Sequence, residues 1–273
     1  MLLIMITRPL LRYHGGKYLL APWIISHFPK HRIYTESFGG AGSVLLQKDP
    51  CYCEVYNDLD NEVVNLFTIC RTQGIELIES LHLTPFSRKE FELSYEKSED
   101  NFEQARRTII RSFMGFGSAA ASGRKTGFRS NSNRSGTTPA QDWKNYPEAL
   151  HFIIERLRGV VIENKDALEI MKAHDTAKTL HYADPPYVLS TRCQGEKTVC
   201  YKFEMTDAQH EMLLTGIKKL IGMVLISGYE NDLYNDLLPD FIKIKKKSFS
   251  DGAMKRIEVL YLSPNIQRQN LLF

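Results

Sequence analysis

Hydrophobic residues form short runs towards both ends of the chain. Those at residues 32–38, 53–57, 160–164, 179–184 and 223–228 have the length and apolar character of buried parallel strands. At the C-terminal end, residues 241–248 and 257–263 flank Asp251-Gly252, which is a hairpin signal. The pattern predicts an α/β fold with a mostly parallel sheet and an antiparallel C-terminal hairpin.

The middle of the chain has a different period. Between residues 66 and 150 apolar side chains recur at helical spacing, as at Ile69, Ile75, Leu77, Ile78, Leu81, Ala105, Ile109, Phe113 and Met114. We therefore expect a helical domain over residues 66–150, inserted into a sheet domain made of residues 1–65 and 151–273.

Composition sets the class of protein. The 273 residues are 43% hydrophobic and 25% charged, as in soluble globular proteins, and a net charge of +3 does not by itself indicate nucleic-acid binding. The five cysteines lack paired zinc-type spacing, so we expect reduced thiols and no metal in a cytoplasmic protein. The apolar residues 1–6 lack a basic leader and are shorter than a signal-peptide core, and we expect no transmembrane span.

Residues 117–141 form a basic segment rich in Gly, Ser, Thr and Asn. It has no acidic residue before Asp142, and it carries Arg124, Lys125, Arg129 and Arg134. Such a segment buries little and repels itself, so a polyanion would order it. The interleaved Phe128, Asn131 and Asn133 would then reach base edges. DNA contact and a merely solvated loop both remain open.

A second basic group lies on the predicted sixth strand. Strand alternation sends Lys243, Lys245 and Lys247 to one face. Lysines on an edge strand prevent sheet-to-sheet aggregation, and the alternative is a surface that contacts phosphates.

The tetrapeptide Asp184-Pro185-Pro186-Tyr187 closes the apolar run 179–183. Ligands of open α/β sheets bind outside the carboxyl ends of the strands, and two prolines fix the backbone direction there. A carboxylate, a fixed carbonyl and an aromatic ring suit the activation of an amine on a flat ring. The alternative is a rigid turn in which Tyr187 serves packing.

A glycine-rich turn follows the first predicted strand, with the sequence Glu36-Ser37-Phe38-Gly39-Gly40-Ala41-Gly42. Its spacing fits neither the dinucleotide fingerprint nor the phosphate loop. Asp58 ends the second strand, where a carboxylate commonly holds ribose hydroxyls. The implied ligand is a nucleoside without a pyrophosphate, a description that S-adenosylmethionine fits.

The ordered motifs resemble the Dam-like class of adenine-N6 DNA methyltransferases over most of the chain. Residues 11–18, with the sequence Leu-Arg-Tyr-His-Gly-Gly-Lys-Tyr, look like the motif that precedes the first strand and encloses the methionine end of the cofactor. The other motifs follow in the family's order, namely the glycine turn, residues 56–58, residues 164–166 and the tetrapeptide. Ala167 departs from the family, which often has an aromatic residue there.

The resemblance implies a Rossmann-like methyltransferase sheet with an inserted target-recognition domain. It assigns catalysis to Asp184, Pro185 and Tyr187. The cofactor, S-adenosyl-L-methionine, would be bound by Tyr13, Lys17, Phe38, Gly39, Gly40, Gly42, Asp58 and Asp166. The expected reaction methylates the 6-amino group of a flipped-out adenine in a specific sequence of double-stranded DNA. We expect a monomer acting in the cytoplasm, in a restriction-modification setting.

Other functions remain compatible with the motifs. The tetrapeptide would equally serve a cytosine 4-amino group, an RNA base or a side-chain amide. A catalytically inert DNA-binding relative is a second alternative, and the glycine spacing makes a nicotinamide enzyme a distant one. We expect no metal-binding residues, because no cluster of His, Cys and carboxylates suggests such a site.

Overall fold

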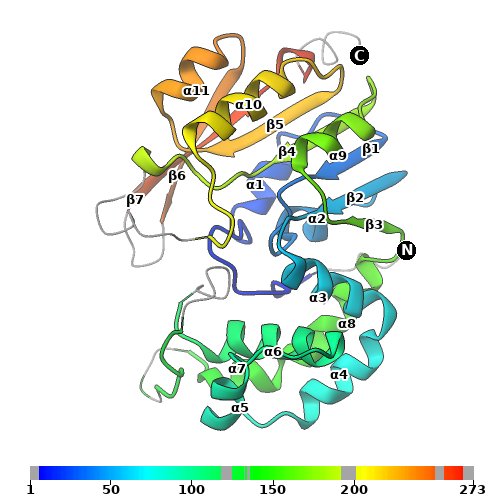
Figure 1. Cartoon of the computed structure of the whole chain (residues 1–273), viewed down its shortest axis with the longest axis vertical. Coiled ribbons are helices and arrows are strands. Elements are labelled where there is room, and N and C mark those ends of the chain that lie inside the picture. Colours follow the sequence, from blue (N-terminus) through cyan, green and yellow to red (C-terminus); the bar gives the residue numbers. More distant parts are fainter. Residues whose placement is uncertain are drawn as a thin grey trace.

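A mixed sheet forms the upper half of the molecule (Figure 1). The computed structural model describes residues 6–117, 125–131, 133, 136–191, 201–249 and 255–266. Within these residues one seven-stranded sheet has the order β3-β2-β1-β4-β5-β7-β6. The strands are β1 (Ile33–Glu36), β2 (Cys53–Asn57), β3 (Val160–Glu163), β4 (Thr179–Ala183), β5 (Met223–Gly228), β6 (Ile242–Phe249) and β7 (Lys255–Leu262).

The first five strands run parallel, and β7 pairs antiparallel with both β5 and β6. This confirms the predicted fold, including the antiparallel C-terminal pair, although the Asp251-Gly252 turn lies outside the described residues. Because β2 and β4 lie on opposite sides of β1, the direction of winding reverses between β1 and β4. Such a reversal opens a crevice at the carboxyl ends of the strands.

Strand alternation sends side chains into two separate cores. On β5, Leu225 joins one core and Val224 the other, and Leu260 and Val259 of β7 divide in the same way. The smaller core is covered by helices α9 (Ala167–Ala173), α10 (Asp207–Ile217) and α11 (Asp232–Leu237). The larger core is covered by α1 (Ala21–Ile25) and α2 (Ser43–Gln47) and continues into the helical half.

The helical half lies below the sheet in Figure 1. It contains α3 (Asn61–Thr72), α4 (Gly74–Leu83), α5 (Arg88–Leu93), α6 (Asn101–Met114), α7 (Pro139–Lys144) and α8 (Tyr146–Arg156), and a single-turn 3₁₀ helix, η2 (Leu189–Thr191), follows β4 in the sheet half. The predicted boundaries at 65/66 and 150/151 fall inside α3 and α8. Both helices belong to the core that also packs on the sheet, so the insertion grows out of the sheet without a flexible linker at these points. Its role as a target-recognition domain stays a prediction.

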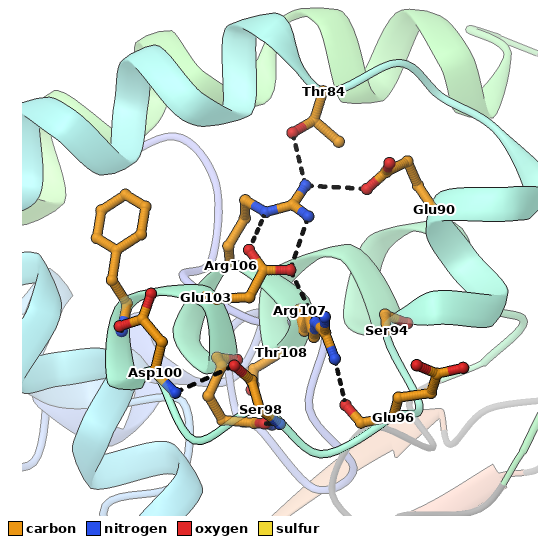
Figure 2. Close-up of polar contacts among 12 residues, drawn as sticks. Thr84, Glu90, Ser94, Glu96, Ser98, Asp100, Glu103, Arg106, Arg107 and Thr108 are labelled. Atoms are coloured by element: carbon orange, nitrogen blue, oxygen red, sulfur yellow. Dashed lines mark hydrogen bonds and ion pairs between the residues drawn. The ribbon is translucent and has the colours of Figure 1, made fainter.

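Paired charges fasten the helices of the insertion to one another. Arg106 of α6 donates to Glu103 on its own helix, to Glu90 of α5 at 2.9 Å and to the Thr84 hydroxyl at 2.9 Å (Figure 2). Arg107 shares Glu103 and also donates to the carbonyl of Glu96 (Figure 2). These bonds join α6 to the loop after α4, to the first turn of α5 and to the loop after α5.

The N-terminal segment, residues 6–18, is tied to the insertion. The hydroxyl of Tyr146 donates to the Leu10 carbonyl at 2.8 Å, and the Arg12 backbone N–H donates to the Ser112 hydroxyl at 2.8 Å. The Arg12 guanidinium also lies 3.4 Å from the carboxylate of Asp142. The segment that carries Tyr13 and Lys17 is therefore anchored on α6, α7 and α8 before it reaches the sheet.

Part of the basic segment packs more tightly than its composition predicts. Phe128 forms an antiparallel bridge with Gly115 and lies against Phe86 and Phe91, with ring centroids 5.1 and 5.7 Å away. The expectation that Phe128 is free to reach a base is wrong in this conformation, because its ring closes an aromatic cluster. Asn131 and Asn133 are exposed, as expected.

Candidate active site

A cavity of about 390 Å³ opens at the carboxyl edge of the sheet, beyond the ends of the paired strands β1 and β4. The residues after β1, β2 and β4 line it, together with the N-terminal segment and the start of α9. Of the cofactor-site residues predicted from sequence, seven line the cavity, namely Tyr13, Lys17, Phe38, Gly39, Gly40, Asp58 and Asp166. Asp184 and Pro186 of the tetrapeptide line it as well.

Neighbouring aromatic rings leave no room for side chains at the glycines of the turn after β1. A Cβ on Gly40 would meet the ring of Tyr13 at 2.9 Å, and a Cβ on Gly42 would meet that of Phe67 at 2.8 Å. The Tyr56 ring fills the corresponding space at Gly39. Side chains of the protein therefore occupy the places of the missing Cβ atoms. Gly42 caps α2 in the left-handed conformation, with φ +63°, and does not line the cavity.

Asp58 is fixed by two backbone N–H groups. One carboxylate oxygen accepts from Gly40 at 2.7 Å and the other from Asp60 at 2.8 Å. Burial raises the pKa of the Asp58 carboxyl, and these N–H groups oppose the rise. The helix that follows is capped by Asp60, whose side chain accepts from Glu62, so Asp58 is left facing the cavity.

Lys17 joins the N-terminal segment to the tetrapeptide. Its ammonium lies 3.0 Å from Oδ2 of Asp184, donates to the Gly15 carbonyl at 2.9 Å and lies 4.7 Å from the centre of the Tyr187 ring. The backbone of Lys17 has φ +50°, an uncommon value for a residue with a side chain. Strain of this kind concentrates at functional sites.

One carboxylate oxygen of Asp184 is available to accept a hydrogen bond. Its Oδ1 is buried and has no hydrogen-bond partner among the residues that the structure describes. Burial raises the pKa of Asp184 to about 6, and the Lys17 ammonium works against that rise. A buried acceptor without a donor is costly, and here it points to a donor that arrives with the substrate.

The Tyr187 ring is held from its edge. Its hydroxyl donates to Oε2 of Glu258 at 2.7 Å, and its ring meets that of Tyr229 edge-on, with centroids 4.5 Å apart. Tyr187 and Pro185 do not line the cavity. They lie beside it, connected to it through Lys17 and Asp184.

Sequence reasoning missed Glu36, the last residue of β1. Its carboxyl lines the cavity and accepts from the Tyr34 hydroxyl and the Leu45 backbone N–H, each at 2.7 Å. Burial raises the pKa of Glu36 to about 8. A glutamate at the end of an apolar strand and directly before the glycine turn was the available signal.

Residues 201–205, which line the cavity, were also missed. Lys202 forms an ion pair of 2.7 Å with Asp60, and the Tyr201 ring meets His14 edge-on at 5.2 Å. The Tyr201 hydroxyl also occupies the space that a Cβ on Gly15 would need. This segment therefore closes the cavity against the N-terminal segment.

The acidic motif after β3 has two roles. Asp166 lines the cavity, and its Oδ1 also caps α9 by accepting from Leu168 and Glu169. Ala167 is buried and lines the cavity beside Leu168. Apolar contact at this edge therefore comes from Phe38 and Leu168 in addition to the small Ala167 side chain.

The predicted DNA-binding residues differ in their surroundings. Lys125 is exposed, whereas Arg129 is 9% exposed and its guanidinium donates to the Phe113 carbonyl at 3.1 Å. Arg124 and Arg134 lie outside the described residues. On β6, Lys243 and Lys245 form ion pairs with Glu230, which fits the protected-edge interpretation of that strand.

The described residues contain neither a metal-binding cluster nor a membrane-spanning helix. No group of three or more His, Cys, Asp or Glu side chains there is arranged to hold a metal ion. None of the helices in that part of the chain combines the length and apolar character needed to cross a membrane.

Comparisons with known proteins agree with this geometry. The DNA adenine methylase of Escherichia coli (strain K12) is 24% identical over 266 residues, covering 92% of each chain. The enzyme of that name from Vibrio cholerae serotype O1 is 28% identical over 268 residues, covering 90% of this chain and 91% of the relative. Residues 13–250 match the family described as D12 class N6 adenine-specific DNA methyltransferase. The match spans both the sheet and the insertion, and the chain belongs to this family of enzymes that methylate adenine in DNA.

Proposed function

We propose that the cavity binds S-adenosylmethionine and that Asp184, Pro185 and Tyr187 present a flipped-out adenine to it. The observation that carries the proposal is the buried Oδ1 of Asp184 at the cavity wall, which has no hydrogen-bond partner in the part of the chain that the structure describes. When bound, S-adenosylmethionine supplies a methyl group already activated by a sulfonium, so the amine needs orientation more than it needs a strong base.

The cavity has groups that suit each part of this cofactor. The Asp58 carboxylate is held open to ribose hydroxyls, and Phe38, Ala167 and Leu168 offer apolar surface for a base. The Glu36 carboxyl, beside the glycine turn, suits the ammonium of the methionine end. Tyr13, Lys17, Gly39, Gly40, Gly42 and Asp166 complete the proposed cofactor site.

The adenine amine would bind beside the Lys17 ammonium, at the Oδ1 of Asp184 that has no described partner. Lys17 bonds the other oxygen, Oδ2, and the 6-amino group, like that ammonium, would lie over the Tyr187 ring. Asp184 and the Pro185 carbonyl accept its two N–H bonds, which favours the pyramidal form of the nitrogen and frees its lone pair. Asp184 then accepts the proton that the methylated nitrogen loses. Stacking on Tyr187 offsets part of the cost of extruding the base, and each amounts to about 1–3 kcal/mol.

Double-stranded DNA is proposed to dock on the insertion and the N-terminal segment. Lys125, Arg124 and Arg134 would supply phosphate contacts, and Asn131 and Asn133 are exposed. Arg129 supports this surface from within by bonding the end of α6. The enzyme would act in the cytoplasm of a prokaryotic cell, where its substrate lies.

The test is to express the chain in a host free of DNA methylation and to map modified bases in that host's DNA. We expect N6-methyladenine in one sequence context, and none when Asp184→Ala is expressed at the same level. Purified Asp184→Ala should still bind S-adenosylmethionine in a calorimetric titration, because Asp58 and the glycine turn remain.

Two outcomes contradict the proposal in different ways. Methylated cytosine would overturn the choice of base. Turnover by Asp184→Ala would remove Asp184 from the chemistry while leaving the family assignment intact.

A further inference from the structure

We propose that Glu258 is a positioning residue for methyl transfer, which fixes the Tyr187 ring against the incoming adenine through the tyrosine hydroxyl. The inference rests on the proposed function of Tyr187 and names the group that holds it. The carboxylate accepts from that hydroxyl at 2.7 Å, and Glu258 is only 8% exposed.

The fold brings Glu258 to the site from far along the chain. β7 runs antiparallel, so its early residues reach the edge where the parallel strands end. Gly228 of β5 pairs with Val259, and the residues next to this pair are Tyr229 and Glu258. Tyr229 is also the ring that meets Tyr187 edge-on. Strand β7 and the residue that follows β5 therefore supply the two groups that contact the rim of Tyr187.

The hydrogen bond determines how the ring can turn. A tyrosine held only by ring contacts rotates about its side-chain bonds, whereas a hydroxyl bonded to a buried carboxylate fixes the direction of the ring plane. Bonds between a hydroxyl and a carboxylate are among the stronger ones in proteins. One face of Tyr187 looks towards Lys17, and that face is where the adenine stacks in the proposed mechanism.

The charges around Glu258 support a local role at the site. Glu258 raises the pKa of Asp184 and, after burial, is the main cause of the raised pKa of Tyr187. Lys246 lies opposite Glu258 in the β6–β7 ladder, and its ammonium lies over the ring of Trp23 at 5.3 Å. If Glu258 only stabilised the hairpin, the effect of substituting it on the rate of methyl transfer would not depend on the Tyr187 hydroxyl.

A double-mutant cycle separates these roles. The variants are Glu258→Leu, Glu258→Gln, Tyr187→Phe and Tyr187→Phe with Glu258→Leu. Single-turnover methyl transfer is measured on a duplex carrying the mapped sequence, and the dissociation constant for S-adenosylmethionine is measured separately. Glu230→Gln removes a carboxylate that pairs with lysines of β6, and it is the matched control.

We expect Glu258→Leu to slow single-turnover transfer by about tenfold to a hundredfold, the range of one charge-assisted hydrogen bond. The dissociation constant of the cofactor should stay within about twofold. Glu258→Gln, whose amide oxygen still accepts, should retain most of the rate. In the Tyr187→Phe background, Glu258→Leu should have no further effect, and Glu230→Gln should match the wild type.

The proposal is overturned if Glu258→Leu transfers at the wild-type rate, or if it slows Tyr187→Phe as much as it slows the wild type. Should Glu258→Leu fail to fold, Glu258→Asp enters the same cycle, because it withdraws the carboxylate while keeping the charge. The Asp184→Ala variant distinguishes a failure of the role proposed for Glu258 from a failure of the proposed function. If that variant is inactive and the cycle is additive, only the role of Glu258 fails.

Discussion

Arg106 of the helical insertion and Asp184 at the carboxyl edge of the sheet differ in how completely their charges are paired. In the insertion, Arg106 has three partners on two helices and a loop. At the sheet edge, Asp184 keeps a buried oxygen without a described partner, and Glu36 has a pKa raised to about 8 by burial. Full pairing stabilises a fold, whereas incomplete pairing retains affinity for a ligand. The difference indicates that the sheet edge carries the chemistry.

One pair of variants provides the strongest test of this contrast. Asp184→Asn should lower methyl transfer by about a thousandfold or more, since the neutral amide lacks the negative charge of the carboxylate and cannot take the proton. Its free energy of unfolding at pH 8 should match or exceed that of the wild type, by up to about 3 kcal/mol. The sign follows from the pKa of about 6, which lies above the ordinary aspartate value. The ionised carboxyl therefore costs stability at pH 8.

Arg106→Met should do the reverse. It keeps the aliphatic stem but leaves Glu90 and Glu103 without their shared cation, so we expect a loss of about 2 kcal/mol of unfolding free energy. Activity per folded molecule should persist. Arg158→Met is the control, because that pair is more than half exposed and contributes little. Denaturant unfolding and active-site titration measure both quantities, and a stable Arg106→Met would remove the contrast.

The acid limb of activity tests the sheet edge alone. Asp184 accepts the amine only when ionised, so kcat/KM should rise through a midpoint near pH 6 as the pH increases. Lys17 stabilises the carboxylate, and Lys17→Gln should therefore move that midpoint to higher pH, in addition to lowering the rate. Lys202→Gln, which removes the ion pair with Asp60, is expected to leave the midpoint in place. A downward shift in Lys17→Gln would contradict the assigned charge.

The smallest expected effect concerns DNA docking on the insertion. Lys125→Gln should reduce the slope of log affinity against log salt by about 0.9 if Lys125 neutralises one phosphate. Lys219→Gln, with the same charge change at an exposed residue in the turn after α10, should leave the slope unchanged. Equal slopes for both variants would mean that Lys125 is only solvated.

The sequence predicted what local patterns determine. Apolar runs gave the strands, and the residues directly after them, including Asp58 and Asp184, were placed correctly at one edge. The position of Glu258 depends on the pairing of β7 with β5 across the sheet, and no local pattern encodes that pairing. The contact between Lys202 and Asp60 likewise joins residues distant in sequence. The environment of Phe128 was predicted wrongly, because its neighbours in the sequence are polar, whereas the aromatic rings against which it packs are distant in sequence.

The ion pair of Lys17 with Asp184 also bears on how the enzyme avoids modifying itself. A lysine amine is a far better nucleophile than the amine of adenine, and this one lies where the substrate is proposed to bind. In this structure its ammonium pairs with Asp184 at 3.0 Å, and a protonated nitrogen has no lone pair to offer. The carboxylate proposed to activate the weak nucleophile of the substrate thus also binds the strong nucleophile of the protein.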